Sequence, residues 1–440
     1  MKLLPLLLST LLLLSSCITT PTPGENDGIT MPVPPEHEIS EITPEPEPIP
    51  EPEPVPEPEP VVERVSFAGC GDNIIYAGNT RDAKSLALEG GREYNFKPMF
   101  EHISEKISSA DIAFINQETL MAGEGYANSY YPCFNSPQDL GYDLVEVGFD
   151  VVNIANNHML DKGADGLSRT IRFWKERDCL MIGGYENAED FDTVRILEKN
   201  GIKIAFLSYA EHTNGISKPA SSELVIPKIV EADIVRQIEN ARAQADFVMV
   251  SVHWGDEGAF RPNEAQKKTA QLIADCGADV IIGHHPHVIQ PVEYLTGKDG
   301  NSTLCVYSLG NLAAEQAYDY NMVGGIIEFD IVSVDDGKPY LENVTFNPTV
   351  FHFPSNFYGN TVYLMSDYTP ELAKIHGVRG YYGHTLTYDG LVNYAVNTIS
   401  EDFLPKNFLG KYNLDKSPAE ENPDSNEISP EAADSVANAA

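Results

Sequence analysis

The sequence predicts an α/β fold that ends in a second sheet, or in the far side of a sandwich. Two observations support this prediction. Between residues 65 and 308, short apolar runs alternate with stretches of helical periodicity, which is typical of α/β layering. The runs 324–332 and 340–353 then follow each other with no helical stretch between them, which indicates a β meander.

The elements follow in order along the chain. Val65 opens a first strand, which Gly69 and Gly71 are expected to end. Further strands are expected at 111–115, 151–155, 203–209, 247–252, 280–282 and 304–308, and helices at 97–109, 140–147, 164–177, 231–243 and 264–276. Residues 355–412 are rich in Tyr and Gly and predict an irregular extension, packed on the domain of residues 63–354, with a helix near 391–399.

Both ends of the chain have compositions that cannot build a core. Residues 17–62 contain 14 Pro and 11 acidic residues but no Lys or Arg, and residues 413–440 contain 7 acidic residues against one Lys. The first segment predicts an extended tether and the second a disordered acidic tail. The net charge of −37 excludes a basic footprint for nucleic acid and argues against direct adhesion to anionic lipid surfaces.

The first 16 residues have the pattern of a secretory signal. Lys2 precedes a leucine-rich run of about 12 residues, too short to span a bilayer, which needs roughly 20. Leu14-Ser15-Ser16-Cys17 resembles a bacterial lipobox, in which the cysteine becomes the lipidated first residue of the mature chain. The alternative is an ordinary cleaved signal with an incidental cysteine. We expect a domain outside the cytoplasmic membrane, lipid-anchored to a membrane of the bacterial cell envelope through Cys17.

Six apolar runs each end in polar residues that could bind a metal or act as acid or base. If the runs are neighbouring strands of one polarity, these ends meet in one cleft, because sites in α/β sheets assemble at the carboxyl ends of the strands. The six ends are Gly71-Asp72, Asn116-Gln117-Glu118, Asn156-Asn157-His158 with Asp161, His253-Trp254-Gly255 with Glu257, Gly283-His284-His285-Pro286-His287, and Gly310-Asn311.

Five of the eleven histidines lie in these ends, and imidazole is the commonest metal ligand. Pro286 excludes a regular helix interior, and in an extended segment residues two apart face the same way. We therefore expect His285 and His287 to bind one metal centre and His284 to point elsewhere. A ligand set of nitrogen and oxygen without thiolate suits Mn, Fe or Zn.

Together, over about residues 65–330, these motifs resemble the CapA-type capsule (poly-gamma-glutamate) synthesis family, which is similar to the calcineurin-like metallophosphoesterases. The resemblance implies a two-sheet sandwich flanked by helices and one or two divalent ions. It implies the metal ligands Asp72, Glu118, Asn157, His253, His285 and His287. It places His158 as the general acid, Asp161 and Glu257 as further catalytic candidates, and Asn116, Asn156, His284 and Asn311 as other pocket residues.

The sequence also departs from the phosphoesterase pattern. Ile74 stands where that superfamily carries a histidine ligand, and Glu118 stands where it has a bridging aspartate. One ion therefore loses a ligand or takes another, from Glu257 or Asn311. A competing interpretation has His158 capping the helix that begins near Gly163, with Asp161 as its partner.

Two function classes remain open from the sequence. One is a metal-dependent hydrolase of phosphoesters that acts in capsule or polymer metabolism. The other is a non-catalytic protein that binds an anionic polymer or capsule-assembly partners.

Overall fold

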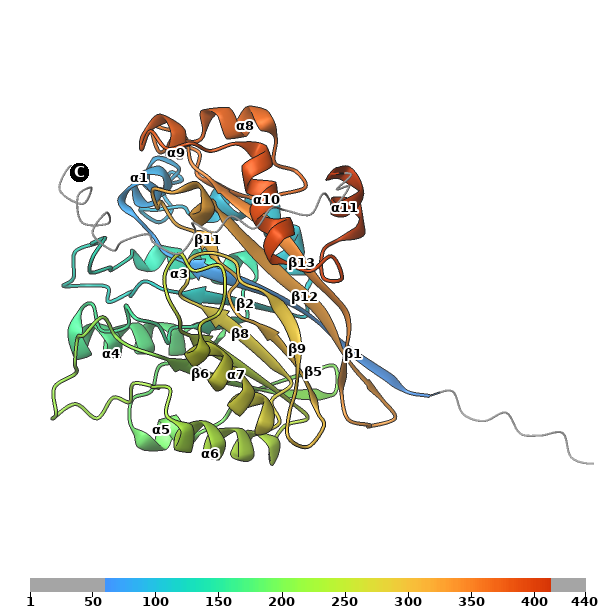
Figure 1. Cartoon of the computed structure of the whole chain (residues 1–440). Coiled ribbons are helices and arrows are strands. Elements are labelled where there is room, and N and C mark those ends of the chain that lie inside the picture. Colours follow the sequence, from blue (N-terminus) through green and yellow to red (C-terminus); the bar gives the residue numbers. More distant parts are fainter. Residues whose placement is uncertain (1–59, 413–440) are drawn as a thin grey trace, which may run out of the picture. The chain divides into compact units, whose positions relative to one another are not determined.

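The computed structural model describes residues 60–412, which form two β-sheets with helices around them (Figure 1). This confirms the predicted α/β fold with two sheets flanked by helices. The first sheet follows the order β14-β13-β12-β1-β2-β3-β4, and β11 pairs with β1 outside this path. The second follows the order β5-β6-β7-β8-β10-β9.

The first sheet is parallel in one half and antiparallel in the other. Strands β1 to β4 run parallel, whereas β12, β13 and β14 form the antiparallel meander. Its strands are β1 (Val62–Asn73), β2 (Ile112–Gln117), β3 (Val151–Asn153), β4 (Leu180–Ile182), β11 (Asn311–Ala313), β12 (Val323–Val334), β13 (Tyr340–His352) and β14 (Thr361–Leu364).

The second sheet has a parallel centre between two antiparallel edge strands, β5 and β9. Its strands are β5 (Arg195–Lys199), β6 (Ile202–Ala210), β7 (Phe247–His253), β8 (Val280–His284), β9 (Val292–Thr296) and β10 (Ser302–Val306).

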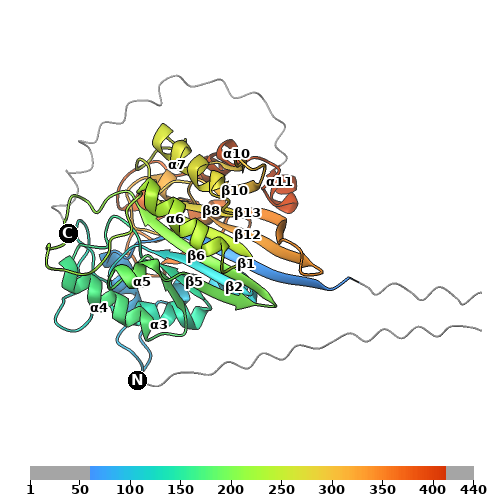
Figure 2. The same ribbon diagram turned by 90° about the horizontal axis from the view of Figure 1, so that it is seen from below.

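Helices lie on the outer sides of the two sheets and at the C-terminal end of the described residues. Figure 2 shows α6 and α7 beside the second sheet, where they contact β6, β7, β9 and β10. The α-helices are α1 (Ala77–Ser85), α2 (Ser104–Ser109), α3 (Gln138–Val147), α4 (Gly163–Lys175), α5 (Ala188–Asp192), α6 (Glu231–Arg242), α7 (Glu264–Asp275), α8 (Pro370–Ile375), α9 (Gly377–Gly380), α10 (Tyr388–Thr398) and α11 (Lys406–Tyr412). The 3₁₀ helices are η1 (Lys97–Ile103) and η2 (Asp319–Met322).

Alternation along the second sheet explains the layering. Ile204 and Phe206 of β6 belong to the large core shared with the first sheet, whereas Ala205 and Leu207 pack in a separate core with residues of α6 and α7. Successive side chains of a strand point to opposite faces, so this sheet is buried on both sides. Such strands read as continuous apolar runs, which is why the sequence shows them so clearly.

Two regions differ from the sequence prediction. The first strand does not end at Gly69, because β1 continues through both glycines to Asn73. The C-terminal extension is more regular than predicted, since β14 pairs with β13 and four helices follow. The predicted helix near 391–399 corresponds to α10.

The signal, most of the tether and the acidic tail lie outside the described residues. The anchoring cysteine, Cys17, lies there as well. Among residues 60–412, no helix has both the length and the hydropathy that crossing a bilayer would require.

Candidate metal centre

The six polar strand ends meet at one end of the two sheets. The ends of β1, β2 and β3 come from the first sheet, and those of β7 and β8 come from the second. Asn311 opens β11 and lies opposite Asp72 of β1. The sequence predicts that these ends meet if the strands are neighbours of one polarity. The strands instead belong to two sheets, whose carboxyl ends lie at the same place.

The backbone at Gly71 directs the Asp72 side chain towards the other polar strand ends. The register of β1 against β2 shifts between Cys70 and Asp72, which is an irregularity of the β-bulge type. A Cβ atom on Gly71 would lie 2.0 Å from the backbone oxygen of Gly310. The glycine is therefore required for the close approach of two backbones, and it does not end the strand as the sequence had suggested.

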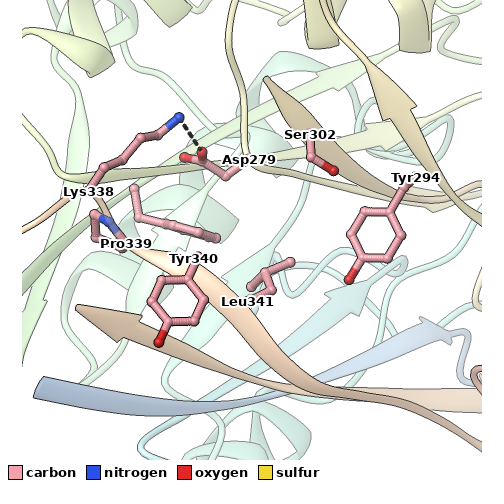
Figure 3. Close-up of a pocket in the computed structure, with 8 residues that line it drawn as sticks. Asp279, Tyr294, Ser302, Lys338, Pro339, Tyr340 and Leu341 are labelled. Carbon is pink, nitrogen blue, oxygen red and sulfur yellow. Dashed lines mark ion pairs between the residues drawn. The ribbon is translucent and has the colours of Figure 1, made fainter. Parts of the chain in front are cut away.

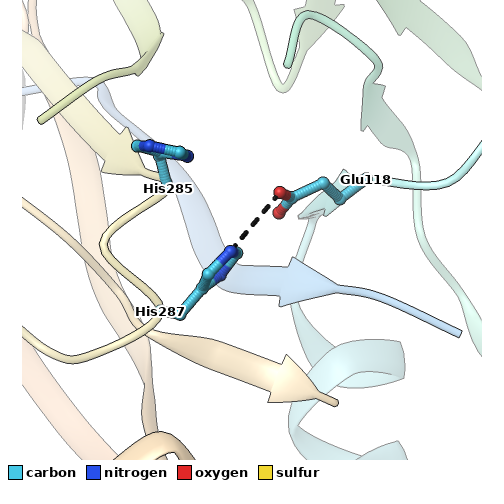
Figure 4. A group of neighbouring side chains, drawn as sticks. All are labelled: Glu118, His285 and His287. Carbon is cyan, nitrogen blue, oxygen red and sulfur yellow. Dashed lines mark ion pairs between the residues drawn. The ribbon is translucent and has the colours of Figure 1, made fainter. Parts of the chain in front are cut away.

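Two overlapping groups of side chains have the spacing of metal ligands. The first consists of Glu118, His285 and His287, which point towards one another in Figure 4, and the second of Asp72, Glu118 and His253. Within each group the potential ligand atoms all lie within 4.8 Å of one another. Glu118 belongs to both groups, so its carboxylate could serve a cation held by either one.

Asp72 is held by neighbours from both sheets. Its Oδ1 accepts a hydrogen bond from Asn116 Nδ2 at 2.8 Å, and its Oδ2 lies 3.1 Å from His287 Nδ1. His284 Nδ1 lies 3.3 Å from Asp72 Oδ1. The expectation that His284 points elsewhere is therefore wrong, because the last residue of β8 turns towards the first sheet and also stacks on Phe114.

The convergence of His285 and His287 has a different geometric cause from the predicted one. Their φ angles are 96° and 55°, so the segment is a left-handed turn and not an extended strand. Gly258 N donates to the Pro286 oxygen at 2.8 Å, and Asn321 Nδ2 donates to the His287 oxygen at 3.1 Å. Neighbouring loops thus hold an unfavourable backbone conformation in place, as is common at functional sites.

Burial and mutual contact shift the ionisation of these groups in opposite directions. Burial would raise the pKa of Asp72, but its contacts with His284 and His287 hold that pKa well below the usual value. Burial and the charge of Asp72 raise the pKa of Glu118 well above the usual value. Burial opposes the charged form of His287, but Glu118 and Asp72 raise its pKa to about 10.

Burial favours the neutral form of His285 and His253. Burial lowers the pKa of His285 to about 3, with a further contribution from the charge of His287. Burial, followed by the charge of His285, lowers the pKa of His253 well below its usual value. Neutral imidazoles beside carboxylates are the donor set that a divalent cation requires.

Unpaired polar atoms test whether a cation fits. Several buried side-chain atoms at this place have no hydrogen-bond partner among residues 60–412, although such atoms are rare in folded proteins. They are Glu118 Oε1, His253 Nδ1, both ring nitrogens of His284, His285 Nδ1 and Asn311 Oδ1. Since oxygen and imidazole nitrogen are ligands of Mn, Fe and Zn, the residues present fit one or two such ions.

His158 forms a dyad beside the ligand groups. Its Nδ1 lies 2.8 Å from Asp161 Oδ2, which also accepts a hydrogen bond from the Phe134 backbone at 2.6 Å. The Phe134 ring packs edge-on against the imidazole. The N-cap residue of α4 is Lys162, so the competing interpretation of His158 as the helix cap does not hold.

The remaining predicted residues take supporting positions. Asn156 Nδ2 donates to the Gln117 backbone oxygen and its Oδ1 accepts from the His158 backbone, so it shapes the loop. Asn311 Nδ2 donates to the His287 oxygen at 3.3 Å. Glu257 is exposed and lies close enough to act on the pKa values of Glu118 and His287.

Sequence reasoning missed two residues of the loop after β6. The His212 ring lies 5.0 Å from that of His285, and Asn214 Oδ1 accepts a hydrogen bond from Asn157 Nδ2 at 3.2 Å. The strand 203–209 also ends in polar residues, so the same strand-end pattern could have found this loop as a seventh end.

A cavity elsewhere in the described residues contains none of these residues. Its volume is about 330 Å³, and it opens between β7, β9, β10 and the start of β13 (Figure 3). Tyr294, Tyr340 and the ion pair between Lys338 and Asp279, 3.8 Å apart, line it. Phe247 and Ser302 are the first residues of β7 and β10, so this cavity is at the opposite end of the second sheet.

Comparisons with known proteins agree on one family. The model of the family described as "Bacterial capsule synthesis protein PGA_cap" matches residues 66–316, which is more than half of the chain. The capsule biosynthesis protein CapA of Bacillus anthracis is 29% identical over 275 residues, covering 61% of this chain and 64% of the relative. The PGA biosynthesis protein CapA of Bacillus subtilis (strain 168) is 31% identical over 199 residues, covering 44% and 50%.

The chain thus spans between half and two thirds of the length of these relatives. Among solved structures, a calcineurin-like phosphoesterase from Bacillus subtilis matches with a TM-score of 0.36 and 13% identity, covering 66% of this chain and 91% of the other.

Proposed function

Because the chain belongs to the bacterial capsule synthesis family PGA_cap, we propose that it acts on a capsule-type extracellular polymer or its precursors, as a metal-dependent phosphoesterase. The observation that carries the proposal is the pair of ligand groups that share Glu118. Divalent ions held by these groups would stabilise an in-line displacement at phosphorus.

The proposed ligands come from both sheets. Asp72 and Glu118 supply oxygen from the first sheet, and His253, His285 and His287 supply nitrogen from the second. Asn157 Oδ1 lies 3.0 Å from His253 Nε2 and would add an amide oxygen. When bound, Mn, Fe or Zn would polarise a phosphoryl oxygen and lower the pKa of a bound water.

His158 would supply the proton for the leaving oxygen. Asp161 accepts from Nδ1–H, which fixes the ring, and with a proton on Nε2 as well the ring would donate Nε2–H to the leaving oxygen. A positioned acid of this kind contributes about 10²–10⁴-fold to a rate. Phe134 packs against the ring and limits its movement, so the group is held in one orientation.

The test starts from purified full-length chain. We expect Mn, Fe or Zn at one to two equivalents, and hydrolysis of an aryl phosphate that stops when a chelator is added and returns with metal. Phosphodiesters should be included, because the site alone does not select between mono- and diesters. Absence of turnover on both ester classes by metal-loaded chain would contradict the catalytic proposal.

A second candidate function follows from the names of the relatives. They are named for capsule and PGA biosynthesis, and neither name refers to hydrolysis. In this case the same metal centre would bind an anionic polymer or an assembly partner without chemistry. Metal-loaded chain that binds poly-glutamate but shows no turnover would favour this function.

We propose that the chain works at the cell envelope, anchored through a lipidated Cys17. The support is the leucine-rich run followed by Leu14-Ser15-Ser16-Cys17. Cys17→Ala should move the protein from the membrane fraction to the soluble fraction or stall its processing. Wild-type chain that is recovered soluble, with a mature N-terminus at another residue, would contradict the anchor.

A further inference from the structure

The Asn157 side chain can serve a cation in only one of its two orientations. Its amide oxygen can bind a metal ion, whereas its NH₂ group is a donor and would repel one. A 180° turn of the amide exchanges the two ends without changing its shape. The oxygen now faces His253 Nε2 at 3.0 Å, on the side of the ligand groups.

We propose that Asn214 is a positioning residue of the metal centre, because it fixes the orientation of the Asn157 amide. Asn214 Oδ1 accepts a hydrogen bond from Asn157 Nδ2 at 3.2 Å. Turning the Asn157 amide would place its oxygen against the Asn214 oxygen and its NH₂ group against the metal ligands. The proposal rests on the proposed function only in assuming that a divalent cation binds here.

The backbone of the loop explains why an asparagine stands at this position. Asn214 has a φ of 50°, in the left-handed region that Asn, Asp and Gly adopt most readily. Thr213 Oγ1 donates to the Ile216 oxygen at 2.7 Å, which closes the turn. The loop follows β6 of the second sheet, whereas Asn157 follows β3 of the first, so this hydrogen bond also joins the two sheets at the centre.

Outer partners of metal ligands typically contribute 10–100-fold to metal affinity. The experiment is a Mn²⁺ titration of chelator-stripped full-length chain. Asn214→Gly removes the acceptor and keeps the left-handed backbone without strain, while Asn214→Asp keeps an acceptor oxygen. We expect 10–100-fold weaker Mn²⁺ binding in Asn214→Gly, and binding at least as tight as wild type in Asn214→Asp.

Asn200→Gly is the matched control. Asn200 has a φ of 48°, is exposed, and donates to the Arg64 oxygen far from the centre along β1. This variant should bind Mn²⁺ as wild type does, and melting temperatures of all three variants show how much each affects the fold.

Unchanged Mn²⁺ affinity in Asn214→Gly would overturn the proposal, as would equal losses in Asn214→Gly and Asn214→Asp. The same titration separates this inference from the hydrolase proposal. A wild-type chain that binds Mn²⁺ tightly but hydrolyses no phosphoester contradicts only the hydrolase. A wild-type chain that binds no divalent ion contradicts both.

Discussion

Two groups of buried histidines lie in this domain, and they differ in what surrounds their nitrogens. At the candidate metal centre, His253 Nδ1, His285 Nδ1 and both nitrogens of His284 have no hydrogen-bond partner in the part of the chain that the structure describes. In the C-terminal extension, His376 Nε2 donates to the Phe351 oxygen at 3.0 Å and its Nδ1 accepts from the Val378 backbone at 3.1 Å.

His352, the last residue of β13, packs against His376 and also has a partner. His352 Nδ1 lies 2.8 Å from the Tyr368 hydroxyl, and its ring packs edge-on against that of His376. Burial lowers the pKa of His352 to about 3 and that of His376 to about 4. These shifts resemble that of His285, so a lowered pKa does not by itself identify a functional histidine.

The two groups differ in whether the side chains gather around carboxylates and in whether their ring nitrogens have hydrogen-bond partners. The histidines of the centre gather around Asp72 and Glu118 and leave ligand atoms unpaired, which is costly unless a cation is bound. His352 and His376 have backbone and hydroxyl partners, which is how buried structural histidines are stabilised. The first group should therefore respond to metal, and the second should respond only to folding stability.

The largest expected effect is at the carboxylates. Asp72→Asn and Glu118→Gln each remove a charged ligand without creating a cavity, and both should lower metal affinity by at least about 100-fold, more than an outer partner does. Metal analysis of dialysed protein measures this. Asp279→Asn is the control, since it removes a buried carboxylate at the other end of the second sheet. If only Asp279→Asn lost metal, the ligands would not be Asp72 and Glu118, and this prediction would be wrong.

His158 should separate chemistry from metal binding. His158→Ala should keep its metal and lose about 10²–10⁴-fold in phosphoester turnover, because the dyad donates a proton and is not in either ligand group. Metal content, melting temperature and turnover are measured on the same preparation. A variant that melts at lower temperature but turns over normally per folded molecule would make His158 a structural residue.

The strand ends of the centre could be read from the sequence because parallel strands place their carboxyl ends together. This argument found Asp72, Glu118 and His253, which lie within one ligand group. It could not show that the ends come from two different sheets, because the alternation of strands and helices is the same in either case.

Other features depend on contacts that no local pattern contains. Gly71 resembled a strand breaker, but it is needed because the Gly310 backbone approaches it from 239 residues further along the chain. The turn at His285 and His287 has positive φ angles that loops far away in sequence hold in place. The strand-end pattern could have found the loop of Asn214, but not the contacts of that side chain with Asn157 and His158, which follow a strand of the other sheet.

In the extension, His376→Ala should change stability and leave the centre intact. The substitution removes both side-chain hydrogen bonds of a fully buried residue, one to the Phe351 carbonyl and one from the Val378 amide, which costs about 2–3 kcal/mol. Urea unfolding measures the loss, and metal titration should give the wild-type value. A variant that folds normally but binds metal poorly would show that His376 contributes to metal binding, which contradicts the separation of the two histidine groups.

The smallest expected effect is the pH dependence that His376 adds to stability. Its pKa is about 4 in the folded chain against an ordinary value of 6.5, because burial opposes the charged form. Below pH 6.5 the unfolded chain therefore binds a proton that the folded chain does not bind, so the free energy of unfolding falls as the pH falls towards 4.

His376→Asn keeps an oxygen that can accept from the Val378 backbone and removes the titrating ring. Between pH 7 and pH 5, wild type should lose about 1–2 kcal/mol more than the variant does. The difference between the two chains removes the contribution of the metal centre, which both share. Equal pH dependence in wild type and His376→Asn would show that His376 keeps an ordinary pKa, and that burial with satisfied nitrogens does not keep this ring neutral.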